Sequence, residues 1–157
     1  MRKINLLFVC ITLFVGVLFS CKKKKAPSPQ ELILGKWKIV KDIRTNLNSQ
    51  GQPTGQPYDA YANYTDCSKN SYVEYFNNGT FARVSNCYST IFNGVYSLEN
   101  VNGTLKLRYR TTTPPPGSIE FVEDVLELNS NTMRVKGTQT GTGSTNYIYE
   151  ITYNKIP

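Results

Sequence analysis

The sequence contains no histidine, the side chain on which much of the acid–base and metal chemistry of proteins depends. Without it, neither a Ser-His nor a Cys-His nucleophile pair can form. The few cysteines alone make a poor zinc site when no histidine accompanies them. We therefore expect this chain to have no enzymatic activity, no cofactor and no metal site.

Most of the net positive charge lies in the first 25 residues, so the rest of the chain lacks a strong charge of either sign. The formal net charge is +7, but two positive charges come from Arg2 and Lys3, and four more come from the lysine run 22–25. Removing these six charges leaves +1 for the rest of the chain. A nearly neutral domain lacks the electrostatic footprint of a nucleic-acid-binding protein, so we expect no nucleic-acid partner.

The N-terminus has the pattern of a secretion signal. Arg2 and Lys3 precede the uncharged apolar run 6–20, which is shorter than the ~20 residues of a membrane-spanning helix. The run ends in the tetrapeptide LFSC, which resembles the bacterial lipobox and ends at Cys21. We expect residues 1–20 to be a cleaved lipoprotein signal peptide and Cys21 to carry acyl groups. The alternatives are an ordinary secretory signal, or an N-terminal anchor helix in which the cysteine is incidental.

Residues 21–30 then form the acylated cysteine and a tether of lysines and prolines. The four lysines either bind anionic head groups or form a solvated linker, which the prolines keep extended. Surface-exported lipoproteins of Bacteroidetes often carry acidic residues at this place. The lysines therefore favour a protein anchored in the bacterial outer membrane and facing the periplasm, where an envelope protein is one potential partner.

The remaining residues, 31–157, suffice for one domain. Of the four cysteines, Cys10 leaves with the signal peptide and Cys21 is acylated. Cys67 and Cys87 remain as an even pair in an exported domain, which predicts a disulfide between them. Two buried free thiols are the alternative.

From Gly35 onward one candidate strand follows another. Eight segments fit strands joined mostly by short turns: 35–44, 71–76, 80–85, 91–98, 104–110, 118–128, 132–137 and 146–153. Eight sequential antiparallel strands predict an all-β, up-and-down barrel, because closure removes exposed sheet edges. A two-sheet β-sandwich is the alternative. We expect a single helical turn at 31–34, and a long irregular loop at 45–66 with a short helix near 58–64.

The alternation of side chains predicts which residues face the interior. In the first strand, Trp37 and Ile43 are expected inside and Asp42 outside. Glu74 and Arg83 lie on the two arms of one predicted hairpin, which makes them candidates for a structural ion pair.

The alternation slips near Glu123 and Asp124. A β-bulge there would turn Leu126 and Leu128 inward again. Adjacent carboxylates on a strand normally point to opposite faces, so we expect these two to be solvated surface charges rather than an acid–base pair.

Several short motifs, taken in order, resemble those of small lipocalin-like lipoproteins of Bacteroidetes. They are LFSCKKK, G-K-W-K at 35–38, Cys67 before an aromatic strand, F-x-N-G-T at 76–80, G-x-Y-x-L at 94–98 and a tyrosine-rich closing strand. The resemblance spans about 31–153. It implies an eight-stranded barrel with one end plugged near Trp37, which with Gly35 forms the G-x-W signature. It also implies that Lys155, where arginine is usual, packs over Trp37.

The resemblance further implies that the barrel binds a small apolar or amphipathic ligand. Tyrosine suits such a cup because it has an apolar body and a polar tip, and the chain has 11 tyrosines. The candidates for ligand contact are Tyr109, Tyr147, Tyr149 and Tyr153, although the same side chains would also fill a packed barrel. The second hypothesis is a packed barrel that acts as an interaction or inhibitor module through the loops 45–66 and 111–117.

Overall fold

The computed structural model describes residues 25–87, 90–112, 120–140 and 146–157. The expected signal peptide, Cys21 and most of the 111–117 loop lie outside these residues. Within them, no helix is both long enough and apolar enough to cross a membrane.

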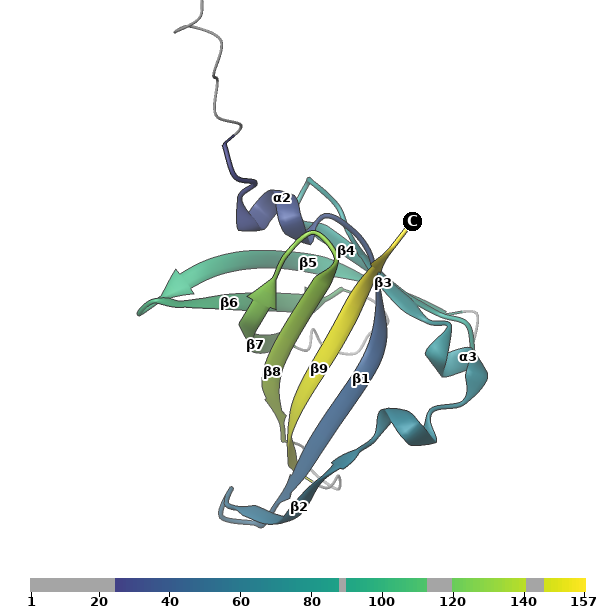
Figure 1. Cartoon of the computed structure of the whole chain (residues 1–157), viewed down its shortest axis with the longest axis vertical. Helices are drawn as coiled ribbons and strands as arrows, with labels where there is room; N and C mark the ends of the chain where they lie inside the picture. Colours follow the sequence, from purple (N-terminus) through teal and green to yellow (C-terminus); the bar gives the residue numbers. More distant parts are fainter. Residues whose placement is uncertain (1–24, 88–89, 113–119, 141–145) are drawn as a thin grey trace, which may run out of the picture.

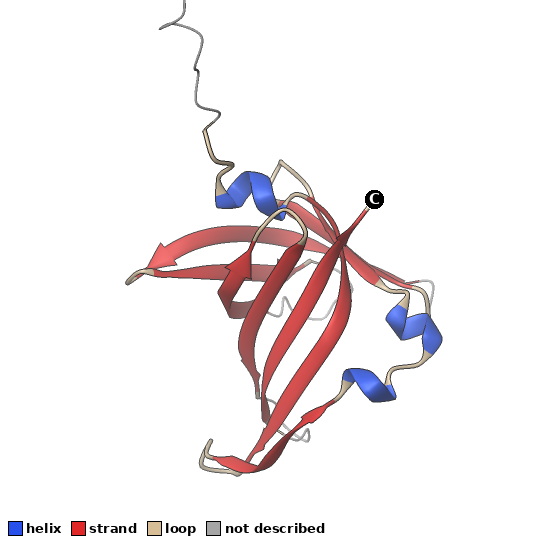
Figure 2. Cartoon of the chain, in the orientation of Figure 1, coloured by secondary structure: helices blue, strands red, loops and turns tan. Residues whose placement is uncertain are grey.

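Strands dominate the structure, and the helices are short (Figure 2). Helix α2 (Pro29–Ile33) precedes β1 (Gly35–Leu47) and β2 (Pro53–Asp59), and the 3₁₀ turn η1 (Tyr61–Asn63) and helix α3 (Asp66–Lys69) follow. The remaining elements are β3 (Tyr72–Tyr75), β4 (Thr80–Ser85), β5 (Thr90–Val101), β6 (Thr104–Thr111), β7 (Glu120–Leu128), β8 (Thr132–Gln139) and β9 (Tyr147–Ile156).

The strands form one antiparallel sheet that closes on itself (Figure 1). From β3 to β9 each strand pairs with the next one in the chain, and β1 pairs with both β3 and β9. This arrangement is an eight-stranded up-and-down barrel with one extra strand, β2. The predicted barrel is therefore confirmed, and the two-sheet sandwich is not formed.

The extra strand β2 corrects the prediction of an irregular 45–66 loop. It pairs with the second half of β1, on the edge that β3 occupies along the first half. Every residue of β2 is exposed, so no face is buried and no apolar alternation marks the strand in the sequence. Backbone pairing with β1 keeps it in place, together with side-chain hydrogen bonds from Thr54 and Tyr58 to Asn46. The short helix expected near 58–64 is present as η1, whereas α3 was not predicted.

Helix α2 covers one end of the barrel and owes its start to a capping box. The Ser28 side chain accepts a hydrogen bond from the Glu31 backbone, and the Glu31 carboxylate accepts one from the Ser28 backbone at 2.6 Å. Pro29 occupies the first turn, where its missing N–H costs nothing. The helical turn predicted at 31–34 is thus real and begins two residues earlier.

Trp37 plugs this closed end, as the resemblance implied. Its indole Nε1 donates to the carbonyl of Ile33 at 2.6 Å, which joins α2 to the first strand. The Nζ of Lys155 lies 5.1 Å from the indole ring centroid and donates to the Leu32 carbonyl at 3.1 Å. Gly35 has a φ of +102°, and a Cβ there would lie 3.2 Å from Cε of Lys155. Glycine at this position therefore lets the lysine reach the indole.

The buried core fills the barrel at the closed end. Its members come from α2 and from all but three strands of the sheet: Ile33, Trp37, Val73, Tyr75, Phe81, Leu107, Met133, Val135 and Tyr153. Every element that contributes to the barrel lies between Pro29 and Ile156. The segment 25–157 therefore contains all the described contacts that hold the barrel together, and it can be studied as a folded unit.

The predicted disulfide joins Cys67 and Cys87. Cys67 lies in α3, and Cys87 follows the end of β4, so the bridge attaches the β2–β3 connection to the opposite end of the barrel from α2. It closes a loop with a sequence separation of 20 residues.

Removing this bridge should lower the free energy of unfolding by about 3 kcal/mol, because the reduced chain gains loop entropy in the unfolded state. Chemical denaturation of the 25–157 segment with and without reductant measures the difference. The variant Cys67→Ser/Cys87→Ser should be as stable as the reduced protein, and adding reductant should not change its stability. Equal stability of all these forms would show that the bridge does not stabilise the fold.

Lys155→Met should lower the free energy of unfolding by about 1–2 kcal/mol, because it removes the cation over Trp37 and the hydrogen bond to α2. Lys41→Met, at an exposed position of β1, is the matched control and should change stability by less than about 0.5 kcal/mol. Thermal and denaturant unfolding measure both. A loss of stability no larger than that of the control would show that Lys155 does not contribute to closing the barrel.

Candidate functional site

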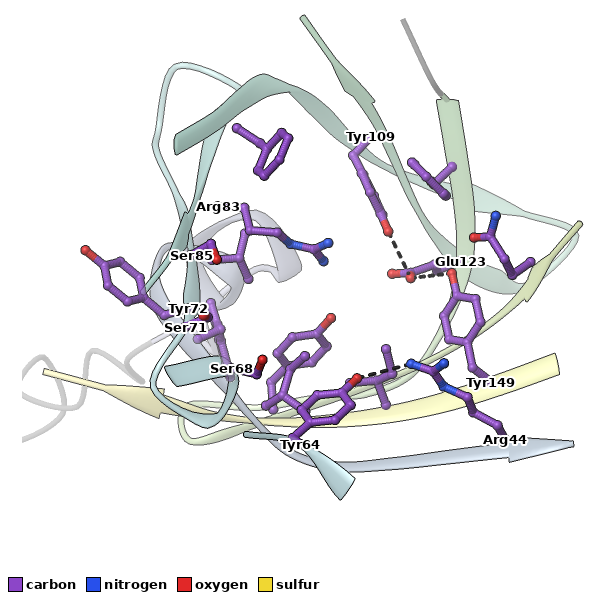
Figure 3. A pocket seen from close by; sticks show the side chains of 18 of the residues that line it. Arg44, Tyr64, Ser68, Ser71, Tyr72, Arg83, Ser85, Tyr109, Glu123 and Tyr149 are labelled. Carbon is purple, nitrogen blue, oxygen red and sulfur yellow. Dashed lines mark hydrogen bonds between the residues drawn. The ribbon is translucent and has the colours of Figure 1, made fainter. Parts of the chain in front are cut away.

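The barrel contains a cavity of about 500 Å³, which we call the cup (Figure 3). The cup lies above the core, toward the end opposite α2, where β4, β6 and β8 end. Its volume falls within the range of ~300–1,000 Å³ typical of small-molecule sites. The walls are mostly apolar and aromatic, with Trp37, Ile39, Val73, Phe92, Phe121 and Ile151 among them.

All four tyrosines proposed as ligand contacts line the cup. Tyr109 comes from β6, and Tyr147, Tyr149 and Tyr153 come from β9. Alternation in these two strands predicts the inward face correctly, because the pairing is regular. No register shift occurs between β6 and its neighbours β5 and β7, or between β9 and β8. Their position is confirmed, and their role as ligand contacts remains a prediction.

A buried carboxylate, Glu123, lies in the wall of the cup and is only 3% exposed. Its Oε1 accepts hydrogen bonds from the hydroxyls of Tyr109 at 3.1 Å and Tyr149 at 2.7 Å (Figure 3). These two tyrosines come from different strands, β6 and β9, so they hold the carboxylate against the wall from two sides.

Tyr149 reaches Glu123 because the residue opposite it on β8 is a glycine. Gly137 pairs with Tyr149, and a Cβ on Gly137 would lie 2.4 Å from the tyrosine hydroxyl oxygen. Any larger residue would push the ring off the wall. Gly137 is therefore a requirement for the hydrogen bond to Glu123.

The expectation that Glu123 is a surface charge is wrong. A bulge is present in β7, as predicted, but the register shifts between Val125 and Glu127 rather than at the two carboxylates. Alternation therefore continues through Glu123 and Val125, and the bulge turns Leu128 inward while Leu126 stays 43% exposed. Asp124 points outward and bonds to Lys106.

Burial raises the pKa of Glu123 above the ordinary range of a glutamate. The hydrogen bond from Tyr149, the positive charge of Arg83 and the hydrogen bond from Tyr109 act in the opposite direction and lower it. Burial also raises the pKa of Tyr109 and of Tyr149, and the neighbouring charge of Glu123 raises both further. These phenols therefore stay protonated and serve as hydrogen-bond donors.

Arg83 extends into the cup from β4, on the side opposite Glu123 (Figure 3). The barrel wall surrounds its side chain, yet water reaches it through the open cup. The suggested Glu74–Arg83 ion pair is wrong, because Arg83 pairs across the hairpin with Val73 and Glu74 pairs with Ala82. Neighbouring positions of a strand point to opposite faces, so Glu74 lies outside the barrel.

A second buried carboxylate, Asp42, lies near the rim and is fully buried. Arg44 donates to both of its oxygens at 2.7–3.2 Å, and the Tyr64 hydroxyl donates to Oδ2 at 2.6 Å. Burial and the hydrogen bond to Asp42 raise the pKa of Tyr64 to about 12. We call Asp42, Arg44 and Tyr64 the rim cluster. It ties the segment after β2 to β1.

The placement of Asp42 on the outer face was also wrong, because the first strand contains a bulge. The register of β1 against β9 shifts between Ile39 and Lys41, so the residues beyond it change sides. Asp42 and Arg44 then face inward, and the guanidinium of Arg44 lies 4.6 Å from the Tyr147 ring centroid. No signal in the sequence marks this bulge.

Among the described residues, no three His, Cys, Asp or Glu side chains are grouped to hold a metal ion. No family model and no curated protein matches the chain.

Glu123→Gln should make the free energy of unfolding less dependent on pH between the unfolded-state pKa of the glutamate, ~4.3, and its raised folded-state pKa. Because burial raises the folded-state pKa, the wild type has the full benefit of the protonated carboxyl below the unfolded-state pKa of ~4.3. It loses that benefit as the pH rises through the folded-state pKa. The variant keeps the acceptor for both tyrosines and has no such loss, so it should be at least as stable as the wild type above this window.

Denaturant unfolding at a series of pH values measures this difference, and Glu127→Gln on the exposed face of β7 is the matched control. The control should follow the wild-type profile. Parallel profiles for the wild type and Glu123→Gln would contradict the raised pKa.

Proposed function

We propose that this protein is a lipid-anchored, lipocalin-like binding protein that holds a small amphipathic ligand in the cup. The observation that carries the proposal is a cavity of about 500 Å³ inside a closed barrel. Aromatic and aliphatic walls provide the apolar contact that burial of a small molecule needs. A few polar groups, Arg83, Glu123 and the tyrosine hydroxyls, are placed to orient it.

The rim cluster supports this proposal because it shapes the mouth of the cup. Arg44 and Tyr64 line the cavity, and Arg44 lies against Tyr147 on the neighbouring strand. The disulfide attaches α3 beside them, and Ser68 of α3 also lines the cup. A mouth that is held by an ion pair and a disulfide presents a preformed site, which lowers the entropic cost of binding.

The proposed anchor at Cys21 fits the direction in which the chain enters the barrel. The described chain begins at residue 25 and leads into α2, at the closed end (Figure 1). Acyl groups on Cys21 would therefore hold the protein by its closed end and leave the mouth of the cup on the other side. We place this anchor in the outer membrane with the barrel facing the periplasm, because lysines rather than acidic residues follow Cys21.

The alternative proposal, a packed barrel that recognises a protein through its loops, has less support. It requires a filled lumen, whereas the described residues line an open cup of about 500 Å³. The 45–66 segment on which it depended consists largely of the end of β1, strand β2 and the 3₁₀ turn η1.

The test is native mass spectrometry of the 25–157 segment, exported to the periplasm behind an ordinary secretory signal and purified without reductant. We expect a retained small molecule that dissociates on unfolding. Ser85→Trp, which places a bulky ring in the cup, should abolish retention, because Ser85 lines the cavity and has a half-buried side chain. Ser130→Trp, at an exposed turn, should retain the ligand as the wild type does. Equal retention by both variants would place the ligand outside the cup.

A further inference from the structure

The cup contains one arginine that is neutralised and one that is not. Arg44 forms a bidentate ion pair with Asp42. Arg83 has neither an ion-pair partner nor a hydrogen-bond acceptor among the described residues. Water reaches this guanidinium through the open cup, so its N–H groups are hydrated rather than paired with protein atoms. An anionic group that entered the cup could replace this water and form charge-assisted hydrogen bonds with Arg83.

Glu123 is not the ion-pair partner of Arg83, although it lies across the cup from it. Both tyrosine hydroxyls that bind Glu123 donate to its Oε1, and these contacts hold the carboxylate on the β6–β9 side. Arg83 is close enough to lower the pKa of Glu123, but the two do not form an ion pair. An open space therefore separates the two charges (Figure 3).

The hydroxyl of Tyr153 adds to the excess of donors. Tyr153 is 4% exposed and lines the cup, and among the described residues its hydroxyl has no hydrogen-bond partner. Burial raises its pKa, so the hydroxyl remains a donor. Arg83 and Tyr153 together thus face the cavity with donors and no acceptor to satisfy them.

We propose that Arg83, together with the Tyr153 hydroxyl that faces the same cavity, binds the carboxylate of an amphipathic acid whose apolar part lies along the aromatic walls of the cup. This inference rests on the proposed function and names the ligand class. A carboxylate supplies two acceptor oxygens in the geometry that a planar guanidinium prefers. The apolar tail would contact Phe92, Phe121 and Ile151, which line the same cavity.

Four probes test the proposal against the 25–157 segment: decanoate, decanol, decylammonium and acetate. Trp37, the single tryptophan of the chain, lines the cup and reports binding by its fluorescence, and titration calorimetry provides a second readout. We expect decanoate to bind more tightly than decanol, decylammonium to bind most weakly of the three, and acetate not to bind because it lacks the tail.

Arg83→Gln should weaken decanoate binding by about 10- to 100-fold, the usual effect of losing a hydrogen bond to a charged group, and should leave decanol binding unchanged. The unchanged decanol affinity also shows that the variant is folded. Arg110→Gln, on the outer face of β6, is the matched control and should bind decanoate like the wild type. Glu123→Gln should bind decanoate as tightly as the wild type or more tightly, since it removes a negative charge from the opposite wall.

Equal affinity for decanoate and decanol, or an equal loss of both in Arg83→Gln, would overturn the assignment of Arg83 and leave the proposed function intact. Tightest binding of decylammonium, lost in Glu123→Gln, would also overturn it, because recognition would then depend on Glu123. Absence of binding by all four probes would contradict both this inference and the proposed function.

Discussion

The pairing of β1 with β9 closes the sheet, and every feature of the cup depends on it. The two strands are paired along almost their entire length, from Lys36 with Ile156 to Asn46 with Tyr147. At one end of this seam Trp37 and Lys155 meet and close the barrel. At the other end Arg44 lies against Tyr147 at the rim. Because of the bulge between these ends, β1 places Trp37 inside the barrel at one end and the Asp42–Arg44 ion pair inside it at the other.

The polar groups of the lumen are difficult to explain by stability alone. A barrel of this size is stabilised most simply by apolar side chains, and replacing buried ion pairs with well-packed apolar residues is often neutral or stabilising. Here Asp42 and Glu123 are both buried, and each has tyrosine or arginine donors from other positions. The rim cluster has a structural explanation, since it attaches the β2–β3 connection. Glu123 and Arg83 join no such segment, so recognition of a ligand explains them better than stability does.

The fold could be predicted because most strands alternate regularly between apolar and polar residues. In β6, Leu107 and Tyr109 face inward while Lys106 and Arg108 lie on the other face, as the pattern indicates. The cup could not be predicted to the same degree, because the side of the sheet on which a carboxylate lies depends on where a strand bulges. One bulge in β1 turns Asp42 inward, and one in β7 sets the faces of the residues beyond Glu123. Neither bulge is marked by a glycine or a proline in the sequence. Strand β2 was missed for a different reason: both of its faces are exposed, so nothing apolar marks it.

The separation of Arg83 from Glu123 follows from the geometry of two tyrosines. Charges of opposite sign in a shared, partly enclosed space attract strongly, and without restraint they would collapse into an ion pair that blocks the cup. Tyr109 and Tyr149 prevent this because both donate to the same oxygen of Glu123 and hold it on its own wall. Gly137 in turn leaves the room that Tyr149 needs. A glycine on β8 thus keeps a guanidinium on β4 available, and the site is organised before any ligand enters it.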